Sequence, residues 1–203
     1  MHISEGVLSA PVLLTGAVLT ATGVAVGLKK MKNEQLPLVG VLSSAFFVSS
    51  LIHIPVGPSA VHLVLNGLLG LLLGWVAFPA ILVGVSLQAL IFQFGGLTTL
   101  GVNTFNMAMP AILCYYLFAR HISQDHPGVA MVLAFGCGFV AILLSAILVA
   151  LSLIFTGESF VAAAKLLVVA HLPVMVVEAV VSALSLGFLM KVRPEILGVP
   201  HAT

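Results

Sequence analysis

The 203-residue chain is too apolar to be a soluble protein, because 61% of its residues are hydrophobic, only 6% are charged and the mean hydropathy is +1.28. A soluble domain carries about 25% charged residues, so most of this surface must face lipid. A net charge of +1 gives no reason to expect a nucleic-acid partner. The long apolar runs lack the alternating polarity of a transmembrane β-barrel. The sequence therefore predicts an all-α, polytopic helical bundle in the cell (inner) membrane, with the lipid bilayer around it.

About seven membrane-spanning helices are expected, since crossing a bilayer takes about 20 apolar residues. In chain order they cover about 10–28, 36–54, 60–94 as two spans divided at Pro79, 104–119, 129–155 and 168–190. The stretch GGLTTLGVNTFNM between the fourth and fifth spans is expected to tuck into the protein, because irregular backbone at membrane depth must be buried or line a cavity. No linker separates the spans, so residues 1–203 are expected to form a single transmembrane domain.

Basic residues orient the spans, because cytoplasmic loops carry an excess of Lys and Arg. With the N-terminus outside and the C-terminus in the cytoplasm, only Lys165 of the seven basic residues falls outside. The other six then lie on the cytoplasmic side: Lys29, Lys30, Lys32, Arg120, Lys191 and Arg193. The sequence therefore predicts an N-out, C-in topology.

Small residues four positions apart indicate close helix packing in lipid. One such series is Ala17, Ala21 and Ala25, and a second is Gly70 and Gly74. We expect both series to face other helices, within the chain or in another subunit.

Four of the seven histidines are candidates for chemistry, because ionisable groups at membrane depth are costly and are functional by default. His121, His126 and His201 fall in cytoplasmic loops or the tail, where a surface role explains them. The remaining four fall on the outer side of the predicted topology: His2, His53, His62 and His171.

His2 stands one peptide bond from the amine of Met1, which is a chelating arrangement. The amine, the His2 backbone nitrogen and His2 Nδ1 can bind one metal ion in two fused rings, with a fourth position left open. Nitrogen ligands in a plane favour Ni²⁺ or Cu²⁺ over Mg²⁺ and Ca²⁺. The alternative is that His2 is an ordinary polar residue at a frayed terminus.

His62 is the expected fourth ligand, because it follows a Gly57–Pro58 turn at the start of a span. His53 precedes that turn and is a candidate supporting group. Metal-bound histidines donate their second N–H to an acceptor nearby, and three polar residues of the 95–106 stretch could provide one or could gate access: Thr98, Asn103 and Asn106.

His171 and Glu178 are seven residues apart in the last predicted span and so share one helix face. They could form a proton relay or gate, or a structural polar contact within the bundle. Neither a GxxxxGK[ST] phosphate loop nor a metallohydrolase signature occurs in the chain. We therefore expect no enzymatic activity and no ATP hydrolysis by this chain itself. Energy for uphill transport would come from a partner or an ion gradient.

Four motifs resemble one known family, in order along the chain: MHISEGVLS at the start, GPSAVHLVLNGLLGLLLG, FGGLTTLGVNTFNMA at 94–108 and AHLPVMVVEAVVSA at 170–183. They are similar to those of the substrate-binding membrane subunits of nickel and cobalt energy-coupling-factor transporters, the CbiM/NikM family. The resemblance implies a single metal-binding transport domain that captures Ni²⁺ or Co²⁺ as substrate, with no organic cofactor. It implies ligands from Met1, His2 and His62.

The resemblance also implies partners: a transmembrane coupling subunit, two P-loop ATPase subunits and, in some systems, a small accessory membrane subunit. Two other readings compete with an ATP-driven importer of this kind. An autonomous secondary carrier would couple metal movement to protons through His171 and Glu178, and a membrane scaffold would bind no metal. The sequence does not separate nickel from cobalt, because the same nitrogen ligands suit both ions.

Overall fold

The structure is a computed structural model that describes residues 2–56 and 59–197, without the side chains of residues 53–61 and 197. Its eight α-helices are α1 Ala10–Lys30, α2 Leu36–Ser49, α3 Asn66–Leu73, α4 Ala77–Phe92, α5 Leu100–Phe118, α6 Pro127–Thr156, α7 Val161–Ala170 and α8 Leu172–Val192. Short 3-10 turns occupy Asn33–Gln35, Gly74–Val76, Ala119–His121, Glu158–Phe160 and Pro194–Leu197. The predicted helical membrane bundle is confirmed, and the described residues add one small hairpin, β1 His53–Val56 with β2 Ser59–His62.

Five helical rods among the described residues are long and apolar enough to cross a membrane: Ala10–Lys30, Asn66–Phe92, Leu100–His121, Pro127–Thr156 and Glu158–Val192. The 14 residues of α2 extend about 21 Å at 1.5 Å per residue, short of a hydrocarbon core about 30 Å thick. The count of seven spans is therefore not confirmed by the described residues, and the N-out orientation remains a prediction.

The expected division of residues 60–94 was wrong in both its start and its break. Residues 59–62 form β2, and the helix begins only at Asn66. The break lies at Gly74, whose φ of 54° is a conformation that glycine adopts without a β-carbon clash. Pro79 lies inside the first turn of α4, where a missing N–H costs no intrahelical hydrogen bond. The expected third and fourth spans therefore join into one bent rod.

The start of the last span was also placed wrongly. Residues 161–192 form two helices that meet at His171. Pro173 lies in the first turn of α8 and lacks the N–H that a continuous helix would use there. Likewise α5 begins at Leu100 rather than 104, so much of the GGLTTLGVNTFNM stretch is helical. The part before Leu100 passes beside the N-terminal segment.

The close-packing prediction is confirmed for Gly70 within this chain, and for the alanine series, which could face another subunit, it remains a prediction. Gly70 packs on α5 so closely that a β-carbon there would overlap the Ala111 carbonyl group. In contrast, Ala17, Ala21 and Ala25 are exposed in this chain. The buried face of α1 is formed by neighbouring small residues, Gly16, Thr20, Gly23 and Gly27.

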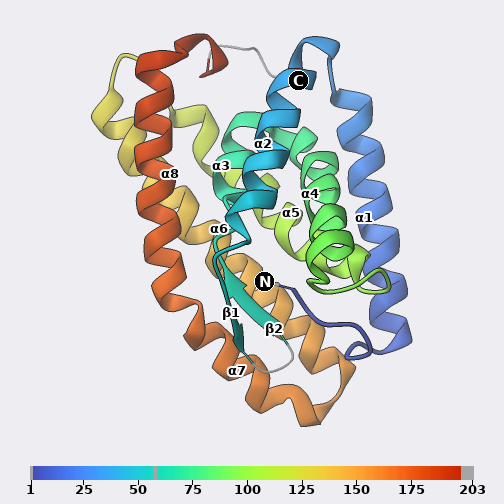
Figure 1. The fold of residues 1–203 in the computed structure, drawn as a ribbon. Helices are drawn as coiled ribbons and strands as arrows, with labels where there is room; N and C mark the ends of the chain where they lie inside the picture. Colours follow the sequence, from blue (N-terminus) through green and yellow to red (C-terminus); the bar gives the residue numbers. More distant parts are fainter. Residues whose placement is uncertain (1, 57–58, 198–203) are drawn as a thin grey trace.

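The two ends of the helical bundle carry different segments of the chain (Figure 1). One end carries the hairpin, α7 and the N-terminal segment that leads into α1. The opposite end carries the C-terminal ends of α1 and α8, with Lys29, Lys30 and Lys191 in their last turns. These three positive charges lie away from the hairpin, whereas Lys165 belongs to α7 at the hairpin end. This is the distribution on which the predicted topology depends.

Candidate metal-binding site

His2 and His62, 60 residues apart in sequence, lie face to face at the hairpin end of the bundle. Their ring centroids are 4.8 Å apart and the rings are within 16° of parallel. Both are buried, at 3% and 2% exposure, and Phe94 lies 6.1 Å from the His2 ring. The structure therefore brings together the two side chains that the sequence singled out as ligands.

The tautomer of His62 suits a metal ligand. Its Nδ1 donates to the Leu63 carbonyl oxygen at 2.8 Å, so the ring proton is on Nδ1 and the lone pair is on Nε2. Nε2 is buried and has no hydrogen-bond partner among the described residues. A backbone carbonyl on the far nitrogen is the usual way to orient a metal-binding imidazole.

The surroundings of His62 keep it neutral. Burial is the main cause that holds the pKa of its imidazole well below the usual range, and the charges of His2 and His171 lower that pKa further. A buried imidazole favours its uncharged form, which is the form that binds a metal ion.

Asn103 holds the N-terminal segment next to His2. The Ile3 N–H donates to Asn103 Oδ1 at 2.9 Å, and Asn103 Nδ2 donates back to the Ile3 carbonyl oxygen at 3.1 Å. The same Nδ2 lies 3.1 Å from Thr99 Oγ1. The side chain of Asn103 therefore pairs with the residue after the candidate ligand, so that its support reaches His2 through the backbone.

The rest of the N-terminal segment rests on the loop before α5. Glu5 accepts a hydrogen bond from the Thr98 N–H at 3.0 Å and donates its own N–H to the Gly95 carbonyl oxygen at 3.0 Å. The Thr98 N–H lowers the pKa of the exposed Glu5 carboxyl. Gly96 has φ of 146°, and a β-carbon there would lie 2.6 Å from the Glu5 carboxyl carbon. Thr98 thus supports the N-terminal segment through its backbone N–H group.

The carboxylate of Glu178 holds the turn that follows His62. It accepts hydrogen bonds from the N–H groups of Val64 and Leu65, the latter at 2.9 and 3.0 Å to its two oxygens. Glu178 is fully buried in α8. This contact spans more than 110 positions in the chain, and no local pattern in the sequence predicts it.

Asn66, which sequence reasoning missed, fixes the other end of this turn. Its Nδ2 donates to the Met107 carbonyl oxygen and to Ser145 Oγ, both at 2.9 Å. Asn66 is fully buried at the start of α3. The available signal was an amide directly in front of the apolar run GLLGLLL, although Asn66 lies inside the first turn of α3, after Leu65 at the N-cap.

His171 and Asn106 have partners of their own. His171 is fully buried at the junction of α7 and α8, and its Nδ1 donates to the Leu167 carbonyl oxygen at 2.7 Å. Asn106 Nδ2 lies 3.2 Å from Ser152 Oγ of α6. His171 and Glu178 thus bond to different groups, and their role as a proton relay remains a prediction.

Two predicted site groups lie outside the description: the whole of Met1 and the side chain of His53. The backbone of His53 is described and pairs with His62 across the hairpin. Among the side chains that the structure describes, which exclude that of His53, no three of His, Cys, Asp or Glu are placed to hold a metal ion. The described part of the site therefore offers His2 and His62 as its side-chain ligands.

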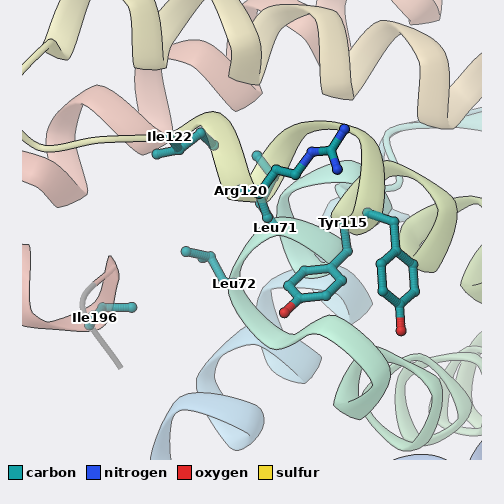
Figure 2. A pocket seen from close by; sticks show the side chains of 8 residues that line it. Leu71, Leu72, Tyr115, Arg120, Ile122 and Ile196 are labelled. Carbon is teal, nitrogen blue, oxygen red and sulfur yellow. The ribbon is translucent and has the colours of Figure 1, made fainter. Parts of the chain in front are cut away.

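A pocket of about 260 Å³ lies between α3, α5 and the last 3-10 turn (Figure 2). Its wall is aliphatic and aromatic, with Arg120 as the charged side chain and Leu71, Leu72 and Tyr115 beside it. No His, Cys, Asp or Glu lines this pocket, so its chemistry does not suit a transition metal ion.

A family model described as the cobalt uptake substrate-specific transmembrane region, CbiM, matches residues 2–196. The chain is 42% identical over 202 residues to a protein of Haemophilus influenzae named as a metal transport protein, a match that covers 97% of each. It is 30% identical over 214 residues to a protein of Methanocaldococcus jannaschii named as the cobalt transport protein CbiM, covering 97% of this chain and 90% of that relative.

A fused protein of Archaeoglobus fulgidus named as the nickel transport protein NikMN is 28% identical over 208 residues, which covers 97% of this chain and 68% of that protein. Among solved structures, the crystal structure of a transition metal transporter is similar with a TM-score of 0.79 at 25% identity. That match covers 95% of this chain and 93% of the other.

Proposed function

The chain belongs to the CbiM family of substrate-specific transmembrane components of cobalt uptake, and from this premise we propose that it captures Ni²⁺ or Co²⁺ with its own N-terminus. The proposed ligands are the Met1 amine, the His2 backbone nitrogen, His2 Nδ1 and His62 Nε2. The chain is a multi-pass membrane transport component, and the metal ion is its substrate.

The observation that carries the proposal is the pairing of His2 with His62. The two rings are 4.8 Å apart, and His62 presents a buried Nε2 with no partner among the described residues. Leaving such an atom unsatisfied costs free energy, so a ligand that binds there is favoured. Nitrogen donors suit late first-row divalent ions, and the fused chelate at residues 1 and 2 supplies the nitrogens that the described side chains lack.

The proposal includes partner subunits, because the chain has no phosphate-binding loop of its own. A transmembrane coupling subunit and two P-loop ATPase subunits would supply the energy, with a small accessory membrane subunit in some assemblies. Uptake in vesicles tests this part. Transport that needs the ATPase subunits supports it, whereas transport by the purified chain under a pH gradient alone would identify a secondary carrier.

Calorimetric titration of the purified full-length chain with Ni²⁺ and Co²⁺ tests the ligand set. His2→Ala and His62→Ala are each expected to abolish tight binding, because each removes a nitrogen that no neighbour replaces. His121→Ala is the matched control, since His121 is exposed in the 3-10 turn that follows α5. Wild-type affinity in His62→Ala would remove His62 from the ligand set, and an absence of binding by the wild-type chain would refute the proposed function.

A further inference from the structure

We propose that Glu178 is a positioning residue for the metal ligand His62. Its carboxylate reaches across from α8 and fixes the backbone turn that carries the imidazole. This inference rests on the proposed function, because it assigns a role to Glu178 through the ligand that it holds in place.

The first argument is the place where the carboxylate binds. Val64 and Leu65 follow the ligand by two and three residues, and both of their N–H groups donate to Glu178. Leu65 has φ of 61°, the left-handed conformation that side chains with a β-carbon disfavour. The carboxylate therefore stabilises a backbone shape that the local sequence does not favour.

The second argument is that the turn is held at successive residues from several helices. The Leu63 carbonyl oxygen accepts from His62 Nδ1 at 2.8 Å and from Ser49 Oγ of α2 at 3.0 Å. Asn66 is bonded to α5 and α6 through its amide. Among these contacts, that of Glu178 is the one in which a single side chain accepts from two successive backbone N–H groups, so it fixes both residues at once.

The third argument is the cost of placing this side chain where it is. An acidic residue inside an apolar bundle is expensive, and Glu178 has 0% exposure. Two converging N–H donors call for acceptors, and a carboxylate presents two acceptor oxygens. A glutamine in the same place would present one oxygen and an NH₂ group, which cannot accept from an N–H.

Ser182 offers a matched control. It lies one turn beyond Glu178 on the same face of α8, and it is fully buried. Its Oγ has no hydrogen-bond partner among the described residues. Ser182→Ala thus alters the same buried helix face without touching the turn at residues 62–66.

The experiment is a double-mutant cycle on Ni²⁺ affinity, measured by calorimetry on the purified full-length chain. Glu178→Gln is expected to weaken binding about tenfold or more, the usual effect of losing a support behind a metal ligand, and Ser182→Ala is expected to leave it unchanged. In a His62→Ala background, the residual weak binding is expected to show no further loss from Glu178→Gln, because the two residues act through one ligand.

Glu178→Asp is the second variant. It keeps the charge but is one methylene shorter, so it is expected to reach the turn poorly and to bind Ni²⁺ more weakly than the wild type. If Glu178→Asp binds Ni²⁺ with wild-type affinity, the reach of the carboxyl group to the turn does not matter, and the positioning role of Glu178 is overturned.

Three further outcomes separate the claims. If the wild-type chain binds no metal, the proposed function fails. If the wild-type chain binds Ni²⁺ and Glu178→Gln has the same Ni²⁺ affinity as Ser182→Ala, only the positioning role of Glu178 fails. An equal loss from Glu178→Gln with and without His62 would indicate a general structural role and would also overturn the inference.

Discussion

The two segments that carry the proposed ligands are anchored by different chemistry. The N-terminal segment is held by the neutral Asn103 amide at Ile3 and by the exposed Glu5 on a loop. The turn after His62 is held by the fully buried Glu178 carboxylate of a long helix. An exposed hydrogen bond, such as that of Glu5, is weaker than one in a buried site of low dielectric constant, such as that of Glu178. The comparison indicates that His62 is the fixed half of the site and that the N-terminal segment is the half more easily displaced.

Of the effects that distinguish the two halves of the site, the largest is expected in the pH dependence of metal affinity. Every proposed ligand must be deprotonated, so metal binding releases protons. Burial keeps the pKa of His62 well below its usual value, so this imidazole stays neutral as the pH falls. An unperturbed α-amine titrates at about 7.7–8.0, so the N-terminal half becomes protonated first.

Ni²⁺ affinity is therefore expected to fall by more than about 30-fold between pH 8 and pH 6, from the amine alone. Calorimetric titrations at pH 6, 7 and 8 measure this slope. A flat profile would point instead to carboxylate ligands, of which Glu5 is the nearest to His2 in sequence.

The second-largest loss of Ni²⁺ affinity is expected from Asn103, whose neutral amide holds the N-terminal segment. Asn103→Ala removes both hydrogen bonds to Ile3 and is expected to weaken Ni²⁺ binding about tenfold, because His2 loses its backbone support. The same titration of Asn106→Ala is the control, since Asn106 is on the same helix but bonds to Ser152 of α6. Equal losses in the two variants would show that α5 is disturbed as a whole.

Both the helical class and the pair His2 and His62 could be predicted from sequence, for separate reasons. Composition decides the class because so few charges cannot cover a soluble surface. The pair was predicted from covalent geometry at residues 1 and 2 and from the resemblance of the segment around His62 to a family motif. The expected start of a span at His62 was wrong, because His62 ends β2, and the expected Gly57–Pro58 turn lies outside the described residues.

The helix breaks, and the side chains that hold the two ligand-bearing segments, could not be predicted from the sequence. Hydropathy is continuous across Gly74 and His171, so it does not show where the backbone changes direction. Glu178 binds a turn more than 110 residues earlier, and only the packing of α8 beside the start of α3 brings the two together. The amide of Asn103 bonds to the backbone of Ile3, 100 positions earlier in the chain, and no local pattern predicts that contact.

The smallest effect is expected at Glu5. Glu5→Gln keeps an oxygen for the Thr98 N–H at an exposed position, so Ni²⁺ affinity should change by no more than about twofold, as for most surface substitutions. Its lowered pKa means that the carboxylate contact is present above the ordinary value and is lost only as pH falls through the lowered one. Glu5 thus adds nothing to the slope between pH 8 and 6, and a tenfold loss in Glu5→Gln at pH 7 would contradict this.

The central claim is that the chain's first nitrogen is a ligand, and blocking that nitrogen tests it most directly. A cleavable tag fused before Met1 converts the amine to an amide without changing any side chain. Ni²⁺ and Co²⁺ affinities are measured before cleavage and after cleavage has regenerated Met1 as the first residue, with a tag after Thr203 as the control. We predict that the N-terminal tag destroys tight binding, that cleavage restores it and that the C-terminal tag is harmless. Equal affinity before and after cleavage would contradict the proposed chelate.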